Sequence, residues 1–526
     1  MRAFHSISAA LITAATLTSA SLAQEIFHRG NGGEPGSLDP HQISGTWESS
    51  IAGDQFLGLY TVAADGSIIP GAAESHSVSD DGLVYTFNIR EHNWSDGTPV
   101  TAHDFEFAFK RILDPATAAS YAYLLHIIEG AKSFNGGDGS ADTVAVRAID
   151  AQTLEVTLAS PAPYFIAQTT HPTAYPVPRH TVEAFGADWS RPENIVVNGA
   201  FKVSEWRIGE VLIALKNPGF YDADNVFLDQ VNFYPIEEPT TELNLYQEGQ
   251  LDVTSKIPAD IIDDVRAEFG DEVMITPYGG TYYYTFNTTV EPFDNPAVRN
   301  ALSMAIDRDF ITTEVNKSGV EPAYSFVPTS ISSGDAGYQV QEPSWAALSY
   351  DERLAMAQET MAELGYTQDS PLALVLSYNT NEGHRNIALA VSDMWAKIGV
   401  TVELFNSDVS THYDSMQAQD YQVGRAGWIW DYPDPENLLA LMSTGVAYNY
   451  GLYNNPEFNA LLDASYQQSG AERLATLQAA EAIAMQEAAV APIHYYNSRH
   501  LVAPYVRGYL PNGDDRHPSR WVSFED

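Results

Sequence analysis

The 526-residue sequence has no cysteine and few basic residues, and both shortages exclude classes of protein. Without cysteine no disulfide framework can form, so the fold must rely on its own hydrophobic core. The 26 Lys and Arg residues stand against 69 Asp and Glu residues, which gives a formal net charge of −43. Because phosphate backbones and anionic membrane surfaces are bound by basic patches, we expect neither nucleic acid nor a membrane surface as a partner.

Long apolar runs are also missing beyond the N-terminus, since no later stretch reaches the ~18 apolar residues of a membrane span. Residues 1–23 have the pattern of a secretory signal peptide, with Arg2, an apolar region and a cleavage-like Ser21-Leu22-Ala23. We expect export with cleavage near Ala23. Since no cysteine is available for a bacterial lipid anchor, the predicted mature protein is free in the periplasm.

Catalytic and cofactor motifs are missing as well. The sequence has no G-x-S-x-G elbow, no H-E-x-x-H and no phosphate loop ending in G-K-[ST]. The glycine-rich stretch 30–36 departs from a dinucleotide fingerprint, because Pro35 occupies the last glycine position. The 14 histidines lack the spacing of structural zinc sites. We therefore predict a protein that is not an enzyme, with no catalytic residue, metal or cofactor.

What remains is the pattern of a folded α/β protein, with 44% hydrophobic and 18% charged residues. Alternation over 83–89 predicts a half-buried strand, and Thr101 with Asp104 forms a capping box for a helix that Asp114-Pro115 ends. Because no low-complexity linker separates modules, we expect the chain to cross between lobes several times. Further helices are predicted at 295–306, 349–364, 384–398 and 471–488, and further strands at 282–286, 373–378 and 493–496.

Two long segments point to a family. They are YTFNIREHNWSDGTPVTAHDFEFAFKR (85–111) and YYYTFNTTVEPFDNPAVRNALSMAIDR (282–308), and they follow a loop-rich opening stretch. Shorter matches, SLDPH (37–41) and NGAFKVSEW (198–206), lie in order around them. Together these segments resemble the periplasmic oligopeptide-binding proteins of ABC importers, extracellular solute-binding protein family 5. The resemblance extends over nearly the whole mature chain.

The resemblance implies an α/β clam-shell of three lobes with mixed sheets, in which two lobes close over an extended peptide. Lobe I would be discontinuous, lobe II would pack on one of its neighbours, and lobe III would oppose lobe I. The predicted boundaries are 24–56, 181–279 and 498–526 for lobe I, 57–180 for lobe II and 280–497 for lobe III.

The stretch GRAGWIWDYPDP (424–435) holds the main candidate residue. By resemblance, Asp431 matches the aspartate that holds a peptide's α-ammonium, while Arg425 and His384 match residues that meet the C-terminal carboxylate of short peptides. The other matching positions are Gly427 and Trp428 along the ligand strand and Tyr121, Tyr283 and Tyr496 in the cleft.

The residues by themselves leave other interpretations open for these positions. Asp431 could be a plain turn residue, Arg425 could form a salt bridge between lobes, and His384 could cap its helix. The tyrosines could belong to the core.

Several positions depart from the well-known members of the family. A lysine that meets the ligand's C-terminus falls at Asn316, with Lys317 beside it. Pocket shape and peptide length are therefore left open. The other departures are Gly280 and Ile429 in place of a cysteine pair, Val409 in place of a tryptophan and Ser44 in place of a glutamate.

The implied function is that of a monomeric receptor. It would capture short peptides with a free α-amine and deliver them to an inner-membrane ABC permease. Three alternatives stay open at this point: the same fold binding a murein peptide, dipeptide, opine or metal chelate, an exported hydrolase, or a signalling or chaperone-like periplasmic protein.

Overall fold

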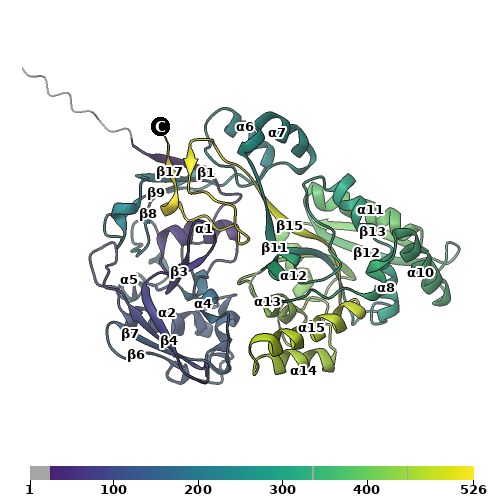
Figure 1. The fold of residues 1–526 in the computed structure, drawn as a ribbon, viewed down its shortest axis with the longest axis horizontal. Helices are drawn as coiled ribbons and strands as arrows, with labels where there is room; N and C mark the ends of the chain where they lie inside the picture. Colours follow the sequence, from purple (N-terminus) through teal and green to yellow (C-terminus); the bar gives the residue numbers. More distant parts are fainter. Residues whose placement is uncertain (1–23, 334–336, 447, 526) are drawn as a thin grey trace, which may run out of the picture.

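The structure, a computed structural model, describes residues 24–333, 337–446 and 448–525, and the predicted signal peptide at 1–23 lies outside the described residues. Three main sheets with their helices make up the described chain (Figure 1). We keep the names lobe I, lobe II and lobe III for the predicted segments, whose boundaries stay predictions.

The first sheet belongs to lobe I and has the strand order β1-β10-β9-β8. Strand β1 runs parallel to β10, and the other pairs are antiparallel. The strands are β1 (Ile26–Gly30), β10 (Gln230–Tyr234), β9 (Val211–Lys216) and β8 (Phe201–Arg207).

The second sheet lies in lobe II and has the antiparallel order β4-β5-β7-β6. Its strands are β4 (Ala73–Val78), β5 (Val84–Ile89), β7 (Thr153–Thr157) and β6 (Val146–Ala148), and the helix α2 (Ala102–Leu113) packs on β6 and β7. The alternation predicted over 83–89 is confirmed, since Tyr85, Phe87 and Ile89 are buried. The capping box is confirmed too: the Thr101 amide donates to Asp104 Oδ2 at 2.8 Å.

Lobes I and II share one hydrophobic core. A continuous cluster of buried residues runs from Phe27 and Val231 in the first sheet to Phe87 and Phe105 in the second. Since interiors of this kind are close-packed and resist deformation, we treat the two lobes as one body.

Lobe III is built on a mixed five-stranded sheet with the order β13-β12-β14-β11-β15. Strand β12 is parallel to β13 and β14, whereas β11 is antiparallel to β14 and β15. A separate core cluster covers each face of the sheet: Tyr282 and Trp395 lie in one cluster, and Trp428 and Leu438 lie in the other. The strands are β11 (Val273–Phe286), β12 (Leu372–Asn379), β13 (Val400–Ser407), β14 (Val423–Ile429) and β15 (Val490–Leu501).

The strands β11 and β15 connect the two bodies (Figure 1). Their outer ends pair from Val273 to Pro277, and their inner ends pair again from Thr281 onward. Between these two ladders three residues of β11 face one residue of β15, so the register is broken at this point. Such a bulge bends a strand locally.

The helices agree with the predicted patterns, with small shifts at their ends. Helix α8 ends at Met304 and not at Ile306, and α11 begins at Glu382 because the Asn381 side chain caps it by accepting from the His384 amide. The helices not bounded above are α1 (Thr46–Gln55), α3 (Ala131–Asn135), α4 (Phe165–Gln168), α5 (Arg179–Phe185), α6 (Pro239–Gln247), α7 (Ile262–Phe269), α8 (Pro296–Met304), α9 (Arg308–Phe310), α10 (Tyr350–Glu363), α11 (Glu382–Ala396), α12 (Val409–Gln417), α13 (Pro435–Leu439), α14 (Pro456–Ser465) and α15 (Gly470–Gln486).

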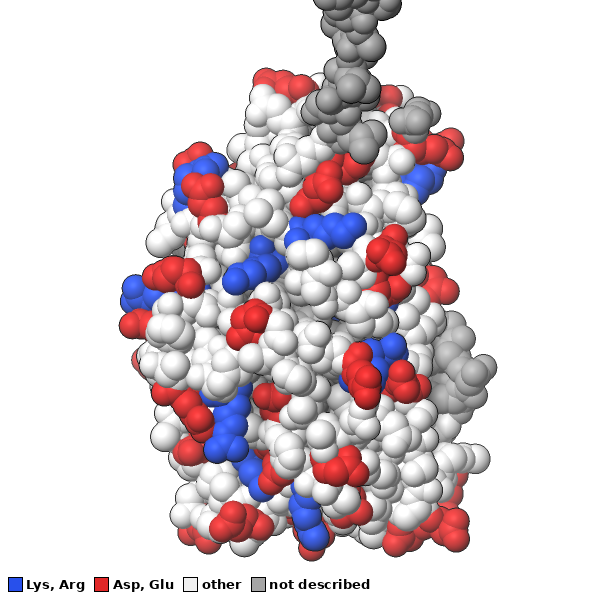
Figure 2. Space-filling view, turned by 90° about the vertical axis from the view of Figure 1, so that its left-hand side faces the viewer, with Lys and Arg blue, Asp and Glu red and all other residues white. Residues whose placement is uncertain are grey.

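The remaining strands are short pairs, β2 (Tyr60–Val62) with β3 (Ile68–Pro70) and β16 (Val506–Arg507) with β17 (Ser523–Phe524). Among the described residues, no helix has the length and apolar character to cross a membrane. On the face shown in Figure 2, acidic side chains are scattered in small groups, and basic side chains lie among them.

Candidate functional site

The strand β14 has one open edge. It pairs with β11 from Val423 to Ile429, but β12 covers its other side only at Val423 and Gly424. The Trp430 amide donates to the Gly279 carbonyl at 2.8 Å, and hydrogen-bonded pairs alternate along an antiparallel ladder. The backbone groups of Gly427 and Ile429 therefore point to the open side.

Arg425 lies at one end of this open edge, and its guanidinium is held in place. Nη2 donates to the Tyr496 hydroxyl at 2.7 Å, while Nη1 donates to Asn379 Oδ1 at 3.1 Å and to the Tyr413 hydroxyl at 3.2 Å. The guanidinium carbon lies 4.6 Å from the centre of the Tyr282 ring. Gly427 makes this arrangement possible, because a Cβ atom there would lie 3.0 Å from Nη2 and against the Tyr496 hydroxyl.

The charge of Arg425 has no counterpart in the protein. The residue is 7% exposed, and no carboxylate of the described chain lies within ion-pair distance of it. Burial alone would lower the pKa of the guanidinium, but the oxygens of Tyr496, Tyr413 and Tyr282 raise it, so the group stays charged. A buried cation without a partner costs several kcal/mol, and an anionic ligand would remove this cost.

His384 stands beside Arg425 and is uncharged. Its ring centre lies 5.5 Å from that of Tyr282, which also stacks on His494 at 4.7 Å. Burial lowers the pKa of His384 well below its usual value, and the charge of Arg425 lowers it further. Because Asn381 supplies the helix cap, the imidazole is not used for capping.

Asp431 lies beyond the other end of the open edge, in a box of aromatic side chains. Its side chain is 5% exposed, and Oδ2 accepts from Asn437 Nδ2 at 3.0 Å and from the Tyr123 hydroxyl at 3.5 Å. His171 Nε2 lies 3.9 Å from Oδ1, but burial lowers the pKa of His171 to about 3, so this imidazole is neutral. Burial raises the pKa of Asp431 to about 7.

The walls of the box come from both bodies. Tyr121 stacks on His171 at 5.5 Å in lobe II, and Tyr123 meets Tyr448 of lobe III at 5.5 Å. Trp428 completes the wall at 4.8 Å from Tyr448, and its indole N–H has no acceptor among the described residues. Asp431 is thus a buried carboxylate with no cation beside it.

The structure brings together most of the predicted site residues. Asp431, Trp428 and Tyr121 lie around the aromatic box, and Arg425, His384, Gly427 and Tyr496 lie at the opposite end. Tyr283 packs edge-to-face on Phe326 at 4.9 Å, in the core cluster that also holds Trp428, and its place in the site stays a prediction. Its neighbour Tyr282 occupies the position beneath Arg425. Four further residues of the candidate site are not predicted by any sequence pattern: Tyr282, His171, Tyr448 and Asn437.

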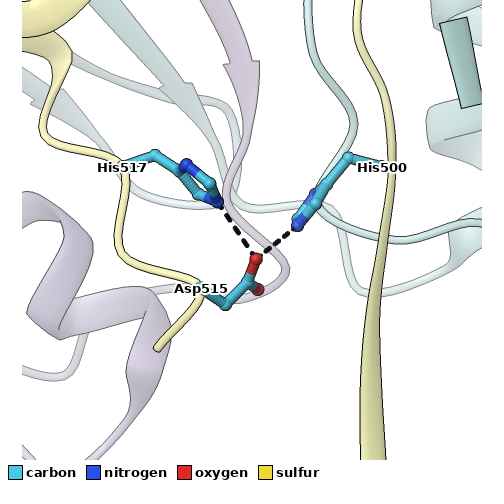
Figure 3. Close-up of side chains that lie close together, drawn as sticks. All are labelled: His500, Asp515 and His517. Carbon is cyan, nitrogen blue, oxygen red and sulfur yellow. Dashed lines mark hydrogen bonds and ion pairs between the residues drawn. The ribbon is translucent and has the colours of Figure 1, made fainter. Parts of the chain in front are cut away.

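Among the described residues, one further group of side chains has the composition of a metal site: His500, Asp515 and His517 (Figure 3). Oδ1 of Asp515 lies 2.8 Å from Nε2 of His500 and 3.1 Å from Nε2 of His517. The other nitrogen of His500 lies 2.8 Å from the Thr254 carbonyl. Both His500 nitrogens thus face acceptors, and a protonated ring donates to both of them. We interpret the cluster as a buried charge pair.

Comparison with known proteins shows which family the chain is similar to. The sequence profile described as bacterial extracellular solute-binding proteins, family 5 Middle, matches residues 67–450. The periplasmic oligopeptide-binding protein OppA of Salmonella typhimurium is 37% identical over 520 residues, which cover 96% of this chain and 95% of OppA.

Solved structures agree over the same length. Haemophilus influenzae OppA in complex with RPPGFSPFR superposes with a TM-score of 0.88 at 35% identity, covering 95% of this chain and 99% of that chain. The murein tripeptide-binding protein MppA of Escherichia coli also gives 0.88 at 34% identity, covering 96% and 99%. An unliganded open form of MppA gives 0.75 at 34% identity, covering 96% and 98%. The lower score against the open form agrees with the contacts between lobes II and III, so the arrangement here is closed.

The raised pKa of Asp431 predicts the effect of Asp431→Asn on stability without ligand. Between the usual pKa of 3.8 and the folded value of about 7, the folded protein binds more protons than the unfolded chain, so stability falls as pH rises through this window. Asparagine removes this penalty, which is at most about 4 kcal/mol. We expect Asp431→Asn to raise the melting temperature, and to raise it more at pH 8 than at pH 5. The exposed Asp420→Asn serves as a control without such a trend. A gain in melting temperature that shrinks as pH rises would contradict the raised pKa of Asp431.

The buried charge pair predicts the opposite trend with pH for Asp515→Asn. Burial would lower the pKa of His500, but the charge and hydrogen bond of Asp515 raise it above its usual value. Stability from a raised histidine pKa is present below the unfolded value and is lost as pH rises through the folded value. We expect Asp515→Asn to cost about 3 kcal/mol at pH 5.5 and less at pH 8.5 in thermal unfolding. Asp514→Asn, which touches neither histidine, should show a difference that is independent of pH.

Proposed function

Because the chain belongs to the bacterial extracellular solute-binding proteins of family 5, we propose that it is a receptor that captures short peptides between its lobes and delivers them to an inner-membrane ABC permease. The relatives are solute-binding proteins and not enzymes. One is named as an oligopeptide-binding protein, and another holds the peptide RPPGFSPFR.

The observation that carries the proposal is a pair of opposite buried charges at the two ends of an open strand edge. Asp431 lacks a cation, and Arg425 lacks an anion. A free peptide in extended form supplies an ammonium at one end and a carboxylate at the other. Buried pairs of this kind form short, strong hydrogen bonds, so both termini would contribute to affinity.

The strand edge between these charges supports binding that tolerates many sequences. Gly427 and Ile429 present backbone donors and acceptors on the open side of β14. A peptide backbone pairs with such an edge whatever its side chains are. Side chains then need only hydrated pockets, in which a bridging water costs at most ~2 kcal/mol.

The spacing along β14 is that of a short peptide. Six residues separate Arg425 from Asp431, and an extended strand of this length spans ~20 Å. The guanidinium folds over Gly427 and shortens this distance. We propose ligands of about two to five residues.

Location and partners complete the proposal. The relative OppA is named as periplasmic. Together with the signal-like pattern at 1–23, this supports export to the periplasm, where the protein would act as a monomer. Tyr123, His171, Tyr448 and Asn437 join Asp431 as proposed contacts of the ammonium end.

Native mass spectrometry of protein purified from a periplasmic extract tests the ligand class. We expect peptides of about two to five residues to co-purify, to be released on denaturation, and to remain intact after incubation. Recovery of only a non-peptide solute, such as an opine or a metal chelate, would overturn the peptide proposal. Turnover of the peptides would instead support a hydrolase.

A second experiment tests the role of Asp431. In calorimetric titration of the wild type, trialanine should bind far more tightly than N-acetyl-trialanine, because acetylation removes the ammonium. Asp431→Asn should cost trialanine about 2–5 kcal/mol and should leave the weak binding of the acetylated peptide unchanged. If the wild type binds both peptides equally well, Asp431 does not hold the ammonium.

A further inference from the structure

Arg425 and His384 lie at the end of the site that would receive a ligand carboxylate, and a further cation could meet the carboxylate there. Asn316 is uncharged and already engaged: its Nδ2 lies 3.4 Å from Nε2 of His494, and its Oδ1 accepts from Ser318 at 2.7 Å. Lys317 is exposed and lines an outer groove with Asp263 and Thr312. Neither residue supplies a second cation beside Arg425.

Lys256 lies on a lobe I loop that is fixed on both sides. The fully buried Glu242 carboxylate accepts from the amides of Ser255 at 2.7 Å and Lys256 at 3.1 Å. Thr254 exchanges hydrogen bonds with Leu501 at the end of β15. The main chain at Lys256 is therefore held rigidly, and only the side chain is free to move.

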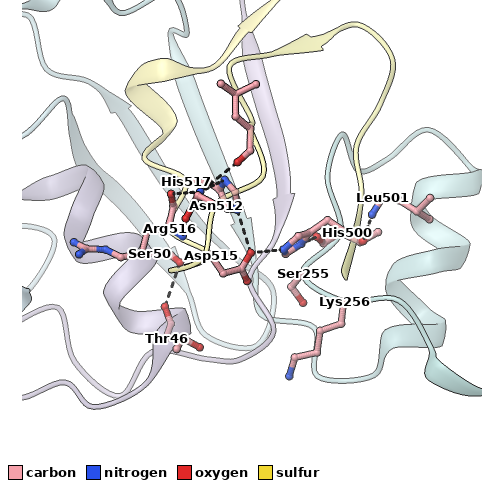
Figure 4. A network of polar contacts seen from close by, with 12 residues as sticks. Thr46, Ser50, Ser255, Lys256, His500, Leu501, Asn512, Asp515, Arg516 and His517 are labelled. Carbon is pink, nitrogen blue, oxygen red and sulfur yellow. Dashed lines mark hydrogen bonds and ion pairs between the residues drawn. The ribbon is translucent and has the colours of Figure 1, made fainter. Parts of the chain in front are cut away.

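The ammonium of Lys256 has no hydrogen bond or ion pair within the described chain. The side chain extends from the loop away from the His500 ring (Figure 4). Solvent reaches the Lys256 side chain. Protein atoms nevertheless surround its ammonium, and the resulting desolvation lowers the pKa of this group. Three carboxylates act on it: Glu242 is engaged with the loop amides, Asp515 is engaged with His500, and Glu237 is exposed. The like charge of Arg499 lowers the pKa of the Lys256 ammonium as well.

Lys256 and Arg425 act on the same imidazole. The pKa of His384 is lowered by burial first, then by the charges of Arg425 and Lys256 among others. His384 and Arg425 belong to lobe III, and Lys256 reaches this point from lobe I. The charges of Lys256 and Arg425 thus act on one imidazole from the two bodies, in a chain with a formal net charge of −43.

We propose that Lys256 is the lobe I partner of the peptide's C-terminal carboxylate, so that this carboxylate is bound from both sides of the cleft by Lys256 and Arg425. The inference rests on the proposed peptide-binding function. An ammonium on a flexible stem suits this task, because it adapts to the end of the ligand while the planar guanidinium of Arg425 stays fixed.

The two-sided contact has a consequence for closure. An open protein offers the carboxylate only Arg425 and His384, whereas closure adds Lys256. A peptide with an amidated C-terminus lacks the charge that would hold Lys256. We therefore expect amidated peptides to bind more weakly and to close the lobes less completely.

Calorimetric titration with trialanine and trialanine amide, both with a free α-amine, tests the assignment. The proteins are the wild type, Lys256→Met, Lys256→Arg and Lys317→Met. The last is a matched control, since it removes the same charge from the outer groove. Thermal unfolding of each variant checks that the exposed substitutions leave the fold intact.

We expect the wild type to prefer the free acid over the amide at least tenfold. Lys256→Met should lower affinity for the acid about tenfold and leave the amide within twofold, so that the preference is lost. Lys256→Arg should retain the preference, and Lys317→Met should behave as the wild type does.

The experiment separates failure of the Lys256 assignment from failure of the proposed function. If Lys256→Met weakens acid and amide equally, or weakens neither, the role of Lys256 is wrong while peptide binding stands. If the wild type binds neither peptide, the proposed function fails. Small-angle scattering gives an independent readout: the acid should shrink the wild-type radius of gyration more than the amide does, and Lys256→Met should abolish that difference.

Discussion

Two buried charges without partners, the carboxylate of Asp431 and the guanidinium of Arg425, are the constraint on which the rest of the site depends. Each is held by neutral hydrogen-bond partners and desolvated by aromatic rings. Water is the alternative partner for such charges, and closure of the lobes removes it. An empty closed protein is therefore disfavoured, and a zwitterionic ligand relieves both charges at once. In the proposed function, the same two charges that would give affinity would also make closure conditional on the ligand.

The distribution of the site between two bodies follows from the hydrophobic cores. Lobes I and II share one core, and lobe III has its own core on each face of its sheet. Asp431 and Arg425 come from lobe III, whereas Tyr123 comes from lobe II. Neither body contains a complete site. Binding of a ligand at this candidate site would therefore require that the two bodies come together.

Much of the fold could be predicted from local patterns in the sequence, and one half of the candidate site follows from the family resemblance. A capping box marked the helix α2, and alternation marked β5, since these patterns depend on neighbours a few residues apart. Asp431 and Arg425 lie in one short motif.

The other half of the site depends on contacts between distant segments. Tyr123 is separated from Asp431 by 308 positions, and no periodicity links them. The contact of Tyr282 with Arg425 could not be predicted for a different reason, because adjacent strand residues such as Tyr282 and Tyr283 point to opposite faces. Only the pairing of Tyr282 with Gly427 across β11 and β14 decides which tyrosine faces Arg425.

The broken ladder between β11 and β15 has a mechanical meaning. Two neighbouring strands form a ribbon that bends at its bulge, while the paired segments on either side keep the strands from sliding past each other. Because the paired segments resist sliding, bending at the bulge is the simplest relative motion of the two bodies. Each time the lobes meet, the same surfaces return to the same alignment. A binding site divided between two bodies can therefore be assembled and taken apart repeatedly without a search for the correct docking.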